Sequence, residues 1–173
     1  MKIIMTSIVA LSLLGQNASL EPDALGVIFS IDKAETTLTR LEKQIAFAKK
    51  VRRESVTTSS IAIEAQVKGE KSSVRLNADS IPQFVVKLTA AGDPAKFRLY
   101  GFDIRKGLRV VTLSVLQKKL LSQKSAAKDR TFDFDVKKVG ENVYRIVPAA
   151  KLPPGEYGFT TNDPQVAFCF GIE

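Results

Sequence analysis

The amino-acid sequence predicts a mainly β protein: an antiparallel β-sandwich, immunoglobulin-like or related, with one N-terminal amphipathic helix. From residue 59 onward, apolar residues recur at every second position in short runs, and Gly, Pro and Asp separate these runs. Many short strands at such spacing are typical of sandwiches and barrels. Before residue 59, one stretch has the three- and four-residue apolar spacing of a helix.

The N-terminal segment 1–18 has the order of a secretory signal peptide. Lys2 is its positive start, Ile3 to Leu14 is a short uncharged run, and small and polar residues follow. This run is too short for a transmembrane helix. We therefore expect a secreted, periplasmic or cell-envelope protein whose mature chain, residues 19–173, is one domain without a transmembrane span.

A first strand is expected at residues 26–31, and the helix at residues 34–53. The helix is predicted by an apolar stripe that recurs at three- and four-residue spacing: Leu38, Leu41, Ile45 and Ala48. Asp32 and Glu35 stand three apart just before it, in the order of a capping box.

A basic cluster closes the predicted helix: Lys49, Lys50, Arg52 and Arg53. One interpretation is an anion-binding site. The other is that these cations complement the negative end of the helix dipole.

Most of the strands that follow are predicted from two-residue alternation, and the strand at 82–89 from a more continuously apolar run. They are expected near residues 61–67, 74–78, 82–89, 97–104, 110–116, 131–137, 142–147, 156–160 and 166–172. In the run 97–104 the alternation slips at Gly101, which predicts a β-bulge there.

Residues 117–130 interrupt this pattern and are expected to form an exposed, mobile basic loop, with room for one helical turn. Only Asp129 opposes the loop's five basic residues, which are Lys118, Lys119, Lys124, Lys128 and Arg130. Together with the cluster at 49–53, these five are the candidates for contact with an anionic partner.

Two carboxylates, Asp133 and Asp135, stand two apart in the predicted strand 131–137. Side chains alternate along a strand, so both fall on one face. They are candidates for a cation site or an acid–base pair. The alternative is the solvated face of a half-buried strand.

Composition excludes several enzyme classes. The chain has no histidine, which removes Ser-His-Asp and Cys-His catalysis and histidine-ligated zinc or copper. Its one cysteine, Cys169, lies between two phenylalanines and is expected to be a buried thiol. We expect no catalytic residues, no bound metal and no cofactor.

The segment Pro153-Pro154-Gly155 predicts a tight turn, and Tyr157 follows it at the start of a strand. Such a tyrosine buries its ring and bonds nearby backbone through its hydroxyl, as in the tyrosine corner of Greek-key sandwiches. The alternative is an exposed tyrosine that stacks on a ligand.

Four motifs spread over most of the chain carry a family resemblance. They are LEKQ at Leu41 to Gln44, DPxxFxLYxFxxxxGxR at Asp93 to Arg109, PGEYGF at Pro154 to Phe159, and FCFGIE at Phe168 to Glu173. Together they resemble uncharacterised secreted bacterial proteins that end in a similar PGEY and FxFG(I/V)(E/D) pattern. The resemblance implies no known activity and supplies no catalytic residue.

The net formal charge of +8 favours an anionic partner. We therefore expect a non-enzymatic accessory or binding protein whose basic surface contacts an anionic lipid, a polysaccharide or an envelope protein, and not nucleic acid. One alternative is a structural or assembly subunit that pairs through its sheet edges. The other is a hydrolase that uses Asp133 and Asp135.

Overall fold

The computed structural model describes residues 20–54, 59–119, 122–125, 130–161, 163 and 165–173. These residues form strands and one 3₁₀ turn, η1, at Pro94–Lys96. The strands are β1 Ile28–Ile31, β2 Leu38–Arg40, β3 Glu42–Ile45, β4 Phe47–Glu54, β5 Ser59–Lys68, β6 Arg75–Leu76, β7 Gln83–Lys87, β8 Arg98–Arg105, β9 Leu108–Lys119, β10 Ser122–Ser125, β11 Thr131–Phe132, β12 Phe134–Gly140, β13 Val143–Pro148, β14 Gly155–Thr160 and β15 Val166–Ile172.

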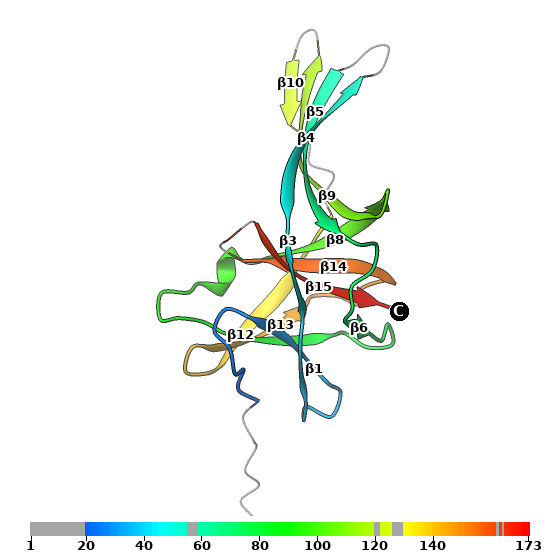
Figure 1. Ribbon diagram of the computed structural model, residues 1–173. Coiled ribbons are helices and arrows are strands. Elements are labelled where there is room, and N and C mark those ends of the chain that lie inside the picture. The colour runs from blue at the N-terminus through cyan, green and yellow to red at the C-terminus, as the bar shows by residue number, and fades with distance from the viewer. Residues whose placement is uncertain (1–19, 55–58, 120–121, 126–129, 162, 164) are drawn as a thin grey trace, which may run out of the picture.

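Two sheets organise these strands (Figure 1). The small sheet has the order β12-β13-β7-β1-β2. The large sheet has the order β3-β15-β14-β8-β9-β5-β4, and β10, β11 and β6 pair with β9, β8 and β15 respectively. Among the described strands, only β6 and β15 pair in parallel. The prediction of a mainly β, antiparallel protein is confirmed.

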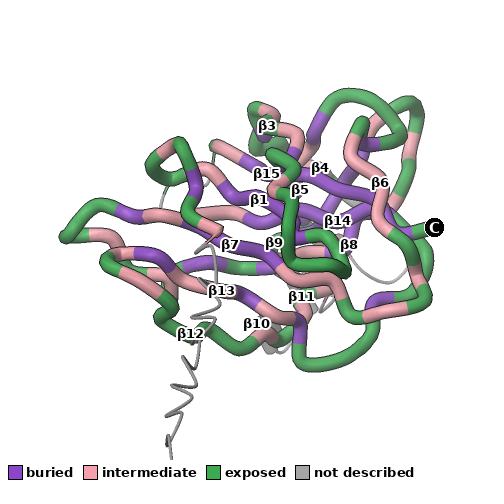
Figure 2. The backbone as a smooth tube through the Cα atoms, turned by 90° about the horizontal axis from the view of Figure 1, so that it is seen from below, coloured by how far each residue is buried: buried purple, intermediate pink, exposed green. Residues whose placement is uncertain are grey.

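The main core lies where the two sheets face each other. Phe84 of β7, in the small sheet, has its ring 5.0 Å from that of Phe159 in β14 and 4.9 Å from that of Phe170 in β15. All three side chains are fully buried. Figure 2 shows buried segments in the middle of the strands of both sheets, while most of the turns are exposed.

The β-bulge predicted at Gly101 is wrong, and the slip in the alternation there has another cause. The register of β8 against β14 runs without a shift through Gly101. Strand β8 is buried on both faces, because Leu99 belongs to the main core and Phe102 to a second cluster beneath β5 and β9. A Cβ at Gly101 would lie 2.9 Å from the Phe132 ring, so glycine leaves room for that ring.

The predicted helix at 34–53 is also wrong. Residues 38–54 form β2, β3 and β4, and the proposed apolar stripe is not a buried face. Leu41 is buried, whereas Ile45 is 62% exposed. Strand β4 instead pairs with β5 at eight consecutive positions. This long-range pairing satisfies the backbone and overrides the local spacing.

The residues expected to cap that helix close a turn between β1 and β2. The Asp32 carboxylate accepts hydrogen bonds from the backbone N–H groups of Thr36 and Thr37, at 2.7 and 3.0 Å. These bonds lower the pKa of Asp32. Glu35 has a φ of 53° in this turn, and its carboxylate pairs with Arg145 of β13 at 3.0 Å. An Asp that bonds the backbone beyond it stabilises turns as well as helix starts.

The basic segment 117–130 is not a continuous loop. Strand β9 continues to Lys119, and β10 returns beside it, with Ser122 opposite Lys119 and Ser125 opposite Leu116. Strands β4, β5, β9 and β10 together form an arm that projects from the body of the protein (Figure 1). We call these four strands the arm.

Candidate functional site

The arm brings together two basic segments that are about 70 residues apart in the sequence. Its strand order is β10-β9-β5-β4, so the segment at 49–53 lies on one outer strand. Lys118 and Lys119 end β9, and Lys124 lies in the other outer strand, β10. The two candidate clusters therefore belong to a single sheet.

Most of the protein's net charge is concentrated in these two segments. Residues 47–54 and 117–130 contain nine basic and two acidic residues, which is +7 of the total formal charge of +8. Lys49, Lys50 and Arg52 are exposed. The structure gives the backbone position of four others: Arg53, Lys118, Lys119 and Lys124. Lys128 lies outside the described residues.

Arg130 differs from the other candidates, because it is ion-paired near the start of β11. Its guanidinium bonds Asp103 of β8. Asp103 also pairs with Arg105 at 3.1 Å, and Arg105 pairs with the buried Glu64 at 2.8 Å. Asp103 and Glu64 thus both have arginine partners.

A buried ionic cluster, which the sequence analysis did not anticipate, lies at the other end of β9. Arg109 has no exposed surface, and its guanidinium donates to both oxygens of Glu42 at 3.1 and 3.2 Å. It also donates to the backbone carbonyls of Lys68 and Gly69. Burial by itself would raise the pKa of Glu42, but hydrogen bonds from Arg109 and other donors outweigh it and lower the pKa to about 2.

The cluster extends toward the C-terminus through Glu156. This buried carboxylate accepts the Ser72 N–H at 2.8 Å and pairs with Arg75, which also bonds Glu173 at 3.1 Å. A Cβ at Gly171 would lie 1.6 Å from the Arg75 guanidinium. Glycine at that position therefore makes room for the arginine. We call Glu42, Arg75, Arg109, Glu156 and Glu173 the charge clasp.

Each of the four motifs in the resemblance contributes a residue to the charge clasp. Glu42 comes from LEKQ, Arg109 ends the GxR stretch, Glu156 comes from PGEY, and Glu173 ends FCFGIE. The sequence signal that could have indicated this cluster is a charged residue in each of the four motifs. Every carboxylate in the charge clasp has an arginine partner. We therefore interpret the four motifs as structural, because they supply the residues that hold these segments together.

Tyr157 and Cys169 are both buried. The Tyr157 ring is 3% exposed and stacks on Phe170, and its hydroxyl donates to the Pro153 carbonyl at 2.7 Å. Gly155 begins β14 directly beneath that ring, and Pro154 is exposed in the turn. Burial raises the pKa of the Cys169 thiol to about 12, which keeps it protonated at neutral pH.

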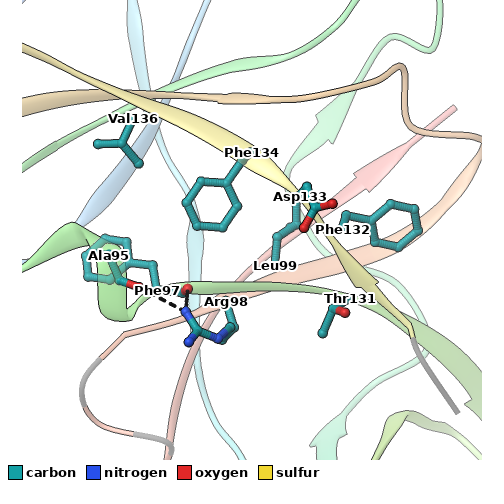
Figure 3. A pocket seen from close by; sticks show the side chains of 9 residues that line it. All are labelled: Ala95, Phe97, Arg98, Leu99, Thr131, Phe132, Asp133, Phe134 and Val136. Carbon is teal, nitrogen blue, oxygen red and sulfur yellow. Dashed lines mark hydrogen bonds between the residues drawn. The ribbon is translucent and has the colours of Figure 1, made fainter. Parts of the chain in front are cut away.

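A cleft of about 460 Å³ opens where the chain crosses from β11, on the large sheet, to β12, on the small one (Figure 3). Phe97, Leu99, Phe132 and Phe134 supply its apolar lining, and Asp133 and Arg98 its charged groups. One Arg98 nitrogen donates to the carbonyls of Ala95 and Phe97, at 2.9 and 2.6 Å.

The two candidate carboxylates differ in their relation to this cleft. Asp133 lines it, and Asp135 does not. Both are exposed. Within the part of the chain that the structure describes, no three acidic or cysteine side chains gather as a metal site requires.

Comparison with protein-family models, with curated proteins and with solved structures found no match for this chain. In the described residues, no helix has the length and apolarity needed to cross a bilayer.

Proposed function

We propose that this protein is a secreted or envelope-associated, non-enzymatic binding protein whose arm contacts an anionic partner. The observation that carries the proposal is the position of the two basic segments on the strands of one arm. A concentrated field of one sign attracts and orients an oppositely charged partner. The candidate partners are an anionic lipid surface, an acidic polysaccharide or an acidic envelope protein.

A binding role agrees with the positions and ion pairs of the protein's acidic residues. The half-buried Glu42 and the buried Glu64 and Glu156 are paired with arginines, and Asp133 and Asp135 do not share the cleft. The signal peptide at 1–18, on which secretion depends, lies outside the described residues. Face-to-face packing of the sheets and the Tyr157 hydroxyl bond support assignment of the fold as a β-sandwich, immunoglobulin-like or related.

The test is a binding titration of the full chain against three anionic probes: phosphatidylglycerol vesicles, dextran sulfate and an acidic peptide. Binding to at least one probe should weaken steeply when salt rises from about 0.05 to about 0.5 M, because exposed charges become screened.

A triple variant, Lys49→Glu, Lys50→Glu and Arg52→Glu, tests the arm directly. Each basic residue near an anionic surface contributes about 1 kcal/mol, so binding should weaken by about a hundredfold or more. The matched control reverses three exposed lysines elsewhere, Lys137, Lys138 and Lys151, and leaves the arm intact. Equal losses in both triple variants would show that net charge alone matters and would refute an arm-specific site.

A further inference from the structure

We propose that the outer edge of β4 binds an acidic, extended polypeptide segment as an additional strand of the large sheet. This inference rests on the proposed function and names the partner's chemistry. Strand addition uses the backbone of the edge strand for affinity and its side chains for specificity.

Strand β4 is a long and regular edge. It is the last strand of the large sheet, and among the described residues only β5 lies beside it. All eight of its residues pair with β5 without a register shift. Every second residue of such an edge strand directs its N–H and C=O groups outward, where a further strand can bind them.

One of the two edges of the small sheet, β12, is protected in the usual way, and β4 is not. Strand β12, at that edge, has a register irregularity between Lys138 and Gly140. Bulges and lysines on edge strands discourage pairing with other chains. Strand β4 has exposed cations and a regular register, so its edge can pair with an acidic segment.

The charges of β4 select an acidic partner. Lys49 falls on one face of the strand, and Lys50 and Arg52 fall on the other, because side chains alternate. All three side chains are exposed. Opposite charges directly across a strand pair are stabilising, so a segment with Asp or Glu on both faces complements this edge.

The same charges disfavour pairing of two β4 strands about their centre. If two β4 strands paired antiparallel about their centre, Lys49 of one would face Arg52 or Arg53 of the other. Like charges directly opposite destabilise a strand pair. A polypeptide is favoured over a lipid or a polysaccharide because only an extended backbone matches the regular spacing of donors and acceptors along the edge.

The experiment compares two synthetic peptides of equal charge, each with adjacent Glu-Asp pairs separated by Val and Thr, so that carboxylates lie on both faces of the extended peptide. One is unmodified, and the other is N-methylated at its central residues, so it keeps its carboxylates and loses its backbone donors. Each lost hydrogen bond contributes about 1 kcal/mol, so we expect the methylated peptide to bind at least about tenfold more weakly. Fluorescence anisotropy at low salt measures both affinities.

Hydrogen exchange supplies a second readout on the full chain. The unmodified peptide should slow exchange of alternate amides in residues 47–54, and dextran sulfate should not, because only a paired strand bonds them. The double variant Lys49→Glu and Arg52→Glu should lose peptide binding. The matched control Lys137→Glu and Lys138→Glu, on the edge strand β12, should retain it.

The outcomes separate this inference from the proposed function. Equal affinity of the two peptides, or binding of only vesicles or dextran sulfate, would overturn strand addition and leave charge-driven binding in place. Absence of salt-sensitive binding to every anionic probe would overturn both.

Discussion

Arg109 combines complete burial with a full positive charge, a combination that is tolerated only when the charge is paired and hydrogen-bonded. Its guanidinium meets this requirement with both oxygens of Glu42 and two backbone carbonyls. Replacement of one partner leaves the other charge buried and uncompensated, which costs far more than the intact pair contributes.

We therefore expect Arg109→Met to lower the free energy of unfolding by about 3–5 kcal/mol. The control is Arg40→Met, which removes an exposed pair with Asp23 at 3.4 Å and should cost about 0–1 kcal/mol. Urea denaturation measures both. Combining Arg109→Met with Glu42→Gln should recover part of the lost stability, because the Glu42 carboxylate no longer remains charged without its arginine partner. Equal costs for the two arginine variants would contradict a structural role for the charge clasp.

Glu42 makes the stability of the protein depend on pH in the acid range. Its pKa is about 2 in the folded protein and about 4.5 when the chain is unfolded. A lowered folded-state pKa gives stabilisation that is complete above the unfolded value and is lost as pH falls toward the folded value. The affected window is therefore about pH 4.5 to 2.

Across that window, Glu42 should account for a loss of about 3 kcal/mol in the free energy of unfolding. Because other carboxylates titrate there too, the measurement is the stability difference between the native protein and Glu42→Gln at several pH values. The difference should be largest near neutral pH and should shrink as the solution is acidified. A difference that stays constant with pH would exclude this linkage.

At the scale of elements, the arm and the body are stabilised differently. Strand β14 has four consecutive buried residues, whereas Phe47, Lys49, Lys50 and Arg52 in β4 are all exposed. Elements with few buried apolar contacts open locally at a lower free energy than the core. The arm is thus expected to be the less stable part of the sheet.

Hydrogen exchange of the unbound protein tests this contrast. The backbone amides of β4 that bond β5 should exchange at least about tenfold faster than those of β14, because opening β4 exposes little buried surface. Amides of β15 serve as a second reference within the core. Equal protection of β4 and β14 would mean that the arm unfolds only with the whole protein.

Local sequence predicted some of the strands correctly and failed for others. Runs with two-residue alternation, such as 142–147 and 156–160, became β13 and β14 nearly as expected. Residues 34–53 did not follow their three- and four-residue spacing, because Glu42 bonds Arg109 from β9 and β4 pairs with β5. Helical spacing is a weak preference that tertiary contacts override.

At the scale of the whole molecule, the fold concentrates positive charge on the arm. The arm carries the excess of cations, while Glu42 and Glu156 lie in the body and are neutralised by arginines. Through Glu173, which follows β15, the charge clasp also connects the C-terminus to Arg75 from the first half of the chain. A basic arm on a fixed body is an arrangement that suits contact with a large anionic partner.

The sequence by itself determined the strand-rich class, the absence of histidine chemistry and the two basic segments, because alternation, composition and charge are local properties. It also placed the bend before β14. Only the tertiary structure decided that the two basic segments share one arm and that four motifs meet in the charge clasp. Both depend on pairings between residues tens of positions apart, such as Glu42 with Arg109, and no local pattern encodes which distant strands become neighbours.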